Sequence, residues 1–342
     1  WMEKCPISQC SKCGTSEFVG EERTFDTWMD SSVSPLFVSK FNNDQEFFNK
    51  IYPVSIRPQA KDIVRTWLYY TLLRCEQLTG KKPWSEAWIM GYGLDEKGMK
   101  MSKSKGNAID PLPVIEQFGA DTFRFWSASE INHGYDFRCN EQKIESTKKF
   151  LSKLWNVSRF LSSFPVIKSG SPTKTDEWIL SELDNLIKEC KKGYDEYNFF
   201  IPAIAIREFT WNLFAAHYIE MVKARAYGIG FTDEERDGAI YTLHKTLSTI
   251  LKLLAPITPF ITEYLWKTLY SSESIHKQHQ VESESVSEQS KNTKEITEFN
   301  SKVWNEKKMK NLSLKDAIKI TIPESLESFK NDLKSMHNLD DS

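Results

Sequence analysis

The spacing of apolar residues predicts two regions with different architecture. In the first, residues 54–57 (VSIR) and 87–92 (AWIMGY) are short apolar stretches typical of buried strands. Residues 62–80 carry apolar side chains at helical spacing and finish with a glycine, which suits a helix C-terminus. Residues 110–119 (DPLPVIEQFG) predict a further helix, with Asp at its N-cap and Gly at its end. This alternation predicts an α/β fold with parallel strands joined by right-handed crossovers.

The second region, from about residue 141, has a helical apolar period over much longer segments. These segments are 141–164, 176–197, 200–227, 232–254 and 257–270. Long amphipathic segments separated by short polar breaks predict an all-α helical bundle. Trp211, Phe214, Tyr218 and Met221 recur within it at helical spacing and are expected to pack in its core.

The chain after the bundle is expected to contain a linker and a small tail. Residues 271–294 are polar, rich in serine and poor in aliphatic side chains, which predicts a linker or exposed loop. The tail is expected to be α+β, with a helix near 295–310, a strand at 317–323 (AIKITIP) and a helix over 324–337.

A cationic loop, GMKMSKSKGN at residues 98–107, follows the second predicted strand and has neither a helical nor a strand period. Lys100 and Lys103 lie three residues apart between Gly98 and Gly106. Their ammonium groups can converge on one polyphosphate, with serine hydroxyls and backbone N–H groups as further donors. Ligands of open parallel sheets bind beyond the carboxyl ends of the strands, so this position suits a phosphate-binding loop.

Composition and charge favour a globular protein and argue against a membrane-spanning or secreted one. The 342 residues are 40% hydrophobic, which is enough for two or three globular domains. The net charge of −2 gives no overall attraction to nucleic acid or membrane, so a polyanion would need local patches. No apolar run reaches membrane-spanning length and no signal-peptide pattern is present, so a cytoplasmic protein is expected. Because the chain opens with Trp1 rather than Met, we expect a fragment of a longer protein.

The six cysteines do not resemble a secreted disulfide framework, because three are clustered and three are scattered. Cys5, Cys10 and Cys13, with Gly14 after the last, form a candidate metal knuckle. A structural zinc site needs four ligands, and these cysteines leave at least one missing. Zinc and an empty, truncated knuckle therefore stay open as alternatives.

The cationic loop resembles the signature loop of class I aminoacyl-tRNA synthetases, since it contains KMSKS in full, followed by Gly106 and Asn107. The stretches DTWMDSSVSPL (26–36), RPQAKDIVRTW (57–67) and GADTFRFW (119–126) are similar to valyl-tRNA synthetases of the archaeal type. The resemblance covers nearly the whole chain.

Two positions favour valyl over isoleucyl relatives within this group. Isoleucyl relatives usually carry Gly where this chain has Ser32, and Gln where it has Ile63. Asp121 and Arg124 also match family positions, although an Asp at a helix start is commonly a cap.

The resemblance implies an ATP-dependent ligase that activates valine and transfers it to tRNA(Val), with Mg²⁺ accompanying ATP. Lys100 and Lys103 would hold the β- and γ-phosphates, and Met101, Ser102 and Ser104 would complete the ATP-binding loop. Asp62 would lie near the ribose, although Ala60 stands where relatives carry Gly. Trp28 and Ile63 would wall the valine pocket, with ordinary core packing as the alternative for both.

For the bundle, the resemblance implies an anticodon-binding domain of a monomeric parent enzyme. Candidate contacts to the tRNA backbone are Lys188, Lys191, Lys192, Arg207, Lys223 and Arg225. For each of them, a solvated surface position is the alternative.

The expected organisation, in residue ranges, is a partial zinc-ribbon-like knuckle at 1–25, the C-terminal half of a class I Rossmann-like domain at 26–140, a helical anticodon-binding domain at 141–270, a polar linker at 271–294 and a small α+β appendage at 295–342.

A His-x-Gly-His turn and an inserted editing domain, both expected in the family, do not occur in the sequence. The chain is therefore expected to be inactive alone. The alternatives are a stand-alone tRNA-binding module without catalysis, and a synthetase for isoleucine or leucine.

Overall fold

The computed structural model describes residues 5–279, 281–284 and 288–340. Trp1, on which the expectation of a fragment rests, lies outside these residues, as do parts of the predicted linker. The chain divides into two compact units, Trp1–Met90 and Gly91–Ser342. This boundary differs from the one near residue 140 that the sequence suggested, because the cationic loop and the helices after it pack with the bundle.

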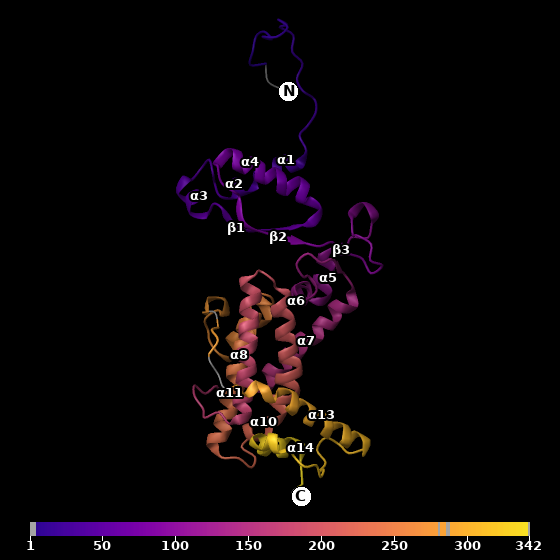
Figure 1. Ribbon diagram of the computed structural model, residues 1–342, viewed down its shortest axis with the longest axis vertical. Coiled ribbons are helices and arrows are strands. Elements are labelled where there is room, and N and C mark those ends of the chain that lie inside the picture. The colour runs from indigo at the N-terminus through magenta and orange to yellow at the C-terminus, as the bar shows by residue number, and fades with distance from the viewer. Residues whose placement is uncertain (1–4, 280, 285–287, 341–342) are drawn as a thin grey trace. The chain divides into compact units, whose positions relative to one another are not determined.

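The first unit contains the predicted parallel pair of strands, β1 (Val54–Ala60) and β2 (Trp84–Met90) (Figure 1). Their register runs from Val54 opposite Trp84 to Ala60 opposite Met90. The crossover consists of a 3₁₀ turn, a π-helical turn and a helix, with the bounds Lys61–Ile63, Val64–Leu68 and α4 (Tyr69–Thr79). Gly80 ends α4 in the left-handed conformation (φ 67°), as its position predicts. The strand–helix–strand prediction is thus confirmed.

Three short helices precede β1 in the same unit: α1 (Thr27–Ser31), α2 (Ser34–Val38) and α3 (Gln45–Ile51). The Asp26 and Asp44 carboxylates cap α1 and α3 by accepting from backbone N–H groups of the first turn. The core of this unit consists of Leu36, Phe48, Tyr52 and Cys75.

The second unit begins with a small parallel pairing of β3 (Gly93–Leu94) with β4 (Phe137–Arg138). Between these strands lie the cationic loop, α5 (Pro111–Phe118) and α6 (Ala120–Glu130). Asp110 caps α5 by accepting from the Leu112 N–H, and the helix ends before Gly119. The prediction for this helix is therefore confirmed.

The helical bundle of the second unit has its predicted helices, and α11 packs against both α8 and α10 (Figure 1). The bounds are α7 (Glu141–Leu161), α8 (Lys174–Asp195), α9 (Phe200–Glu208), a π-helical segment (Phe209–Tyr218), α10 (Ile219–Ala226), α11 (Asp233–Leu254) and α12 (Pro259–Leu269). Phe214, Tyr218 and Met221 are fully buried, as expected, whereas Trp211 is 38% exposed. The expectation of core packing was thus wrong for Trp211.

Part of the predicted linker is built into the bundle. Ile275, in the 3₁₀ turn Ile275–Lys277, is 3% exposed and packs in the main core. The Glu263 carboxylate accepts from the Ile275 N–H (2.9 Å) and from the Ser274 hydroxyl (3.0 Å). The linker prediction was wrong at this turn, because burial of one aliphatic side chain and an anchoring carboxylate offset the cost of ordering it.

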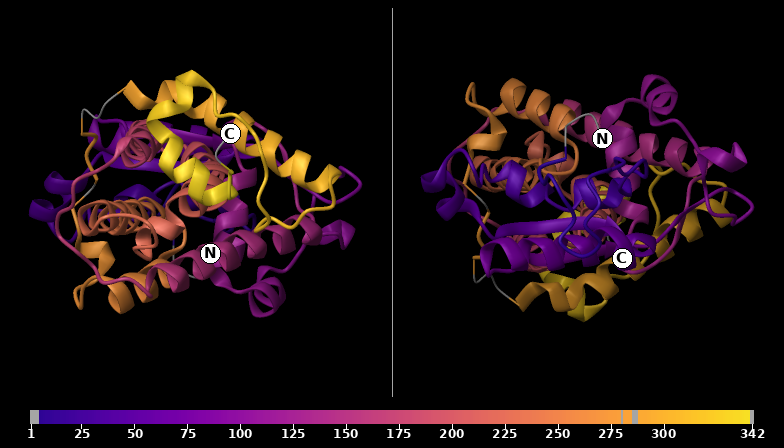
Figure 2. Two further views of the ribbon diagram at one scale, coloured as in Figure 1. Left: turned by 90° about the horizontal axis from the view of Figure 1, so that it is seen from below. Right: turned by 90° about the horizontal axis from the view of Figure 1, so that it is seen from above.

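The tail shares the core of the bundle instead of forming a separate appendage (Figure 2). Its helical elements are α13 (Thr293–Met309), a 3₁₀ turn (Glu324–Phe329) and α14 (Lys330–His337). Within the described part of this tail, the expected strand at 317–323 is reduced to one bridge between Ile318 and Leu339. Ile318 is buried in the core nevertheless, so its apolar pattern reports burial and not sheet pairing.

Candidate nucleotide-binding loop and tRNA-binding surface

The cationic loop begins with a tight reversal around one carboxylate. Leu94 and Lys100 form an antiparallel bridge, and Gly98 adopts φ 81° at the turn. The Asp95 carboxylate accepts from the backbone N–H groups of Lys97 (3.0 Å) and Met99 (2.8 Å). The two ends of the reversal are therefore fixed by Asp95.

A second residue, Asn107, fixes the other end of the loop. Its amide donates to the Asp95 carboxylate (2.9 Å), and its side-chain oxygen accepts from the Ser102 N–H (3.0 Å). The Asn107 hydrogen bond is the main cause of a lowered Asp95 pKa, with the Met99 N–H adding to it. Sequence reasoning missed Asp95, although an Asp three residues before a glycine is a signal for such a turn.

The lysines of the loop are exposed at its surface. The Lys100 ammonium lies 4.1 Å from the centroid of the Tyr92 ring, and Lys103 begins the 3₁₀ turn Lys103–Lys105. The Ser102 and Ser104 hydroxyls lie 3.3 Å apart. Two ammonium groups and two hydroxyls form a set of donors that suits a polyphosphate.

Met101 has a different role from the polar residues around it. Its N–H donates to the Gly93 carbonyl (3.0 Å), and its side chain packs against the core cluster that contains Val114 and Trp126. Met101 therefore anchors the loop to the small sheet.

The residues predicted for the ribose and the amino acid lie in the first unit. Trp28 is partly buried on α1, and Ile63 is partly buried in the turn directly after β1, where α1 packs against the π-helical turn. Asp62 is exposed beside Ile63. Ala60 has an extended backbone (φ −81°, ψ 155°), so its conformation does not require glycine.

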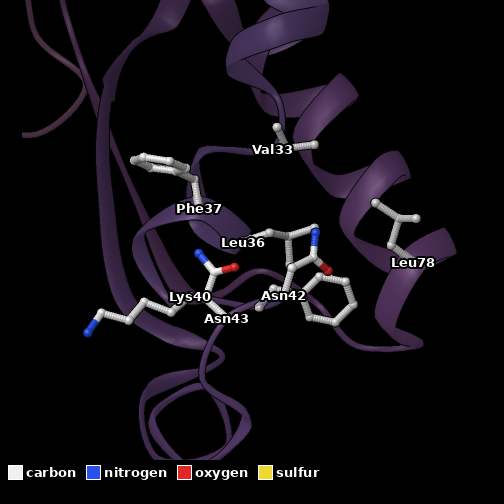
Figure 3. Close-up of a pocket in the computed structure, with 8 residues that line it drawn as sticks. Val33, Leu36, Phe37, Lys40, Asn42, Asn43 and Leu78 are labelled. Atoms are coloured by element: carbon white, nitrogen blue, oxygen red, sulfur yellow. The ribbon is translucent and has the colours of Figure 1, made fainter.

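The first unit also contains an apolar pocket of about 390 Å³ between the α2–α3 connection and the end of α4 (Figure 3). Val33, Leu36, Phe37 and Leu78 contribute its apolar walls, and Lys40 lies at its edge. Trp28 and Ile63 are not among its described lining residues, so this pocket is distinct from the predicted amino-acid site.

The cysteine knuckle is only half formed as a metal site. The Cys10 carbonyl accepts from the Gly14 N–H (2.9 Å), and backbone N–H groups of Cys13 and Lys12 lower the Cys10 pKa. A lowered pKa favours the thiolate that binds metal. Among the residues that the structure describes, however, no three His, Cys, Asp or Glu side chains gather as a metal site, and Cys5 does not join the pair. The described residues therefore do not supply the four ligands of a structural zinc site.

Arg225 is not a surface residue. Its side chain is fully buried and donates to both oxygens of Asp176 (2.7 and 2.9 Å) and to Asp332 (3.0 Å). The Tyr218 hydroxyl donates to the same Asp176 carboxylate. The expectation that Arg225 contacts tRNA was wrong, because its guanidinium is enclosed between carboxylates of α8 and α14.

Arg207 and Lys223 remain accessible on the bundle. Arg207 lies 3.6 Å from Glu208, and Lys223 lies 3.4 Å from Glu220 and 5.6 Å from the centroid of the Phe160 ring. Exposed ion pairs contribute little free energy, so both side chains can exchange their partners for a phosphate.

Asp121 and Arg124 join α6 to the bundle. The Asp121 carboxylate accepts from the Ile261 N–H (2.6 Å) in the first turn of α12. The Arg124 guanidinium donates to the Ile257 (2.8 Å) and Pro256 (3.0 Å) carbonyls. Asp121 is therefore a helix cap, but of a helix far along the chain instead of its own.

Comparison with protein families agrees with this arrangement. Residues 1–139 match the family of class I tRNA synthetases (I, L, M and V), and residues 176–322 match the anticodon-binding domain of tRNA ligases. The fold and the family matches together define a class I tRNA synthetase region followed by an anticodon-binding domain.

Curated relatives narrow the family further. The chain is 41% identical to a valine–tRNA ligase of Aeropyrum pernix over 98% of this chain. It is also 41% identical to the valine–tRNA ligase of Pyrobaculum aerophilum, over 100% of this chain. It covers 42% and 44% of those relatives, respectively. The chain is thus similar to valine–tRNA ligases over nearly its whole length and spans about two fifths of the length of the relatives it matches.

Solved structures support the fold. A ternary complex of the agnB2 LeuRS of Agrobacterium radiobacter K84 with tRNA and LeuAMS matches 80% of this chain and 35% of that chain, with a TM-score of 0.64 and 21% identity. Methionyl-tRNA synthetase of Mycobacterium tuberculosis, in complex with methionyl-adenylate, matches 70% of this chain and 49% of that chain (TM-score 0.60, 20% identity).

In the described part of the chain, no helix combines the length and the apolar character needed to cross a membrane.

Proposed function

We propose that the chain is part of a valine–tRNA ligase, in which it supplies the pyrophosphate-binding loop and the anticodon-binding bundle. The observation that carries this proposal is the KMSKS loop, presented at the surface by the Asp95–Asn107 hydrogen bond. The reaction joins the valine carboxylate to the α-phosphorus of ATP with release of pyrophosphate, and then transfers the valyl group to a terminal hydroxyl of tRNA(Val) with release of AMP.

Lys100 and Lys103 act on the leaving group. Their ammonium groups hold the β- and γ-phosphates and neutralise the charge that develops on pyrophosphate, with Ser102 and Ser104 as further donors. No protein nucleophile is required, because the substrate carboxylate attacks directly. Mg²⁺ supplies further neutralisation of the phosphates when it accompanies ATP.

The first unit supplies the substrate-binding residues of this proposal. Trp28 and Ile63 form walls of the valine pocket, where a rigid indole and a branched side chain crowd larger amino acids. Asp62 accepts a hydrogen bond from the ribose. Ala60 has an extended backbone that any residue can adopt. Its methyl group is therefore the only difference from the glycine that relatives carry at this position.

The bundle supplies the tRNA contacts. Arg207, which is partly exposed, and Lys223, which is exposed, bind phosphates of the tRNA backbone. The proposed parent enzyme is a cytoplasmic monomer.

Valine-dependent pyrophosphate exchange tests the role of the loop, with the protein at the full length of its relatives. Lys103→Ala should reduce the exchange rate by orders of magnitude and leave tRNA affinity nearly unchanged. Lys105→Ala, in the same exposed 3₁₀ turn, is the matched control and should retain most activity. Equal exchange rates for Lys103→Ala and the parent would refute the proposed role.

The amino-acid specificity is tested in the same assay with a panel of valine, isoleucine and leucine. Exchange that depends on isoleucine or leucine instead of valine would favour a synthetase for that amino acid.

A second candidate function is tRNA binding without catalysis, which is supported by the match of residues 176–322 to the anticodon-binding domain of tRNA ligases. A filter-binding titration of the chain with tRNA(Val), alongside the exchange assay, distinguishes the two. Tight, salt-dependent binding by a full-length protein that lacks exchange activity would favour the binding module.

A further inference from the structure

The second unit contains a groove of about 480 Å³. The residues that line it follow the cationic loop by at least 80 positions in the sequence. The groove is formed by α8, the turn after it, the α11–α12 connection and, from the predicted linker, residues 275–279 and Val281. This volume is within the range of sites that bind small ligands or single nucleotides. The groove therefore combines segments that the sequence places far apart.

The charge of the groove suits an anion. Lys191, Lys252, His276 and His279 line it, and none of its described lining residues is acidic. Lys191 has a surface partner, Asp195, at 3.2 Å, and such exposed pairs are readily exchanged. The lining offers ammonium and imidazole donors, and the Asp195 carboxylate that pairs with Lys191 is itself exposed to solvent.

The aromatic lining includes one residue in an unusual conformation. Tyr197 lines the groove, has φ 54°, and is 39% exposed. It lies at the reversal that ends α8, where the Asn198 N–H donates to the Gly193 carbonyl (2.8 Å). Glycine is the usual residue at such a position, because a β-carbon is strained there. The left-handed backbone at Tyr197 costs free energy, and the ring is too exposed for its burial to offset that cost. The chain nevertheless presents this phenol ring at the groove.

The linker side of the groove is held in place. Glu263 binds the Ser274 hydroxyl and the Ile275 N–H, and the Ile275 side chain is buried. His276 therefore follows an anchored residue and is presented to the groove by a fixed backbone.

We propose that this groove holds one unpaired nucleotide of the bound tRNA. The base stacks on the rings of Tyr197 and Phe199, and its phosphate lies near Lys191 and Lys252. Unpaired RNA bases are commonly recognised by stacking on aromatic side chains, with cations at the backbone. The proposal rests on the tRNA binding of the proposed function and adds the site of one nucleotide.

Tyr197→Gly separates binding from folding. It removes the ring and relieves the backbone strain, so the chain should be as stable as the parent or more stable, while its affinity for tRNA(Val) falls about tenfold. Asn311→Gly is the matched control, since Asn311 has the same φ of 54° and does not line the groove. It should leave tRNA affinity unchanged. Affinity is measured by filter binding with the 342-residue chain, and stability by urea unfolding.

A lysine pair tests the phosphate contact. Lys191→Met should weaken binding and reduce the slope of log K against log salt by about one. Lys294→Met is its control, because Lys294 is in a similar exposed i, i+4 pair, with Glu298, and does not line the groove. That control should leave the slope unchanged.

The outcomes distinguish this site from the function on which it rests. Parental affinity in both Tyr197→Gly and Lys191→Met would overturn the groove and leave tRNA binding intact. Absence of tRNA binding by the parent chain would overturn both the groove and the tRNA contacts of the bundle. Weakened binding with unchanged or increased stability would support the nucleotide site.

Discussion

The Asn107 amide donates to the Asp95 carboxylate at 2.9 Å, across twelve residues of sequence, and so closes the cationic loop. The same amide group orients Ser102 through its oxygen. The lysines between these two residues are therefore carried on a loop whose ends are fixed, which reduces the ordering needed when a polyphosphate binds.

Asn107→Ala should impair adenylate formation without unfolding the protein. Loss of a hydrogen bond to a carboxylate is expected to lower the rate of valine-dependent pyrophosphate exchange about tenfold or more, in the protein at the full length of its relatives. Asn212→Ala is a matched control, since the Asn212 amide also donates to a carboxylate, that of Glu208, on an exposed helix. An exchange rate equal to that of the parent would mean that the loop does not need this hydrogen bond.

Arg225→Met should destabilise the bundle strongly. It leaves Asp176 and Asp332 buried without their cation, and breaking a buried pair in this way costs about 3–5 kcal/mol. The free energy of unfolding is measured by urea titration of the chain. Arg207→Met removes an exposed pair and should change it by less than about 1 kcal/mol. Similar stabilities for the two variants would contradict the structural role of Arg225.

Acid should destabilise the tail through His337. Burial is the main cause that lowers the His337 pKa to about 4, and the Lys307 ammonium adds to it. The unfolded chain takes up this proton near pH 6.5, whereas the folded chain does so only near pH 4. Between these values the unfolded state binds more protons, so the free energy of unfolding falls as the pH falls, by at most about 3 kcal/mol.

His337→Gln tests this dependence. The variant lacks the titrating imidazole, so its stability should fall less steeply than that of the parent between pH 6.5 and 4. Carboxylates titrate in both proteins, and the difference between the two slopes isolates His337. Identical slopes would show that this histidine is protonated in the folded state at the same pH as in the unfolded chain.

Local sequence patterns predicted those elements that local interactions stabilise. Asp110 caps α5 and Gly80 ends α4 as expected, because caps depend on residues within one turn. The pattern at 317–323 failed as a strand signal, since alternation shows which face is buried and not whether a neighbouring strand is present. Ile318 is buried as the pattern requires, but it packs against helices.

The sequence by itself determined the KMSKS loop, the parallel strand pair and the order of the helices, because a motif and an apolar period are written in consecutive residues. Only the tertiary structure decided that Arg225 is a buried ion-pair partner, that Asp121 caps α12 and that Ile275 belongs to the core. Each of these roles depends on groups far away in the chain. A basic or acidic side chain has the same local pattern at the surface as in a buried pair, so only its neighbours in space distinguish the two.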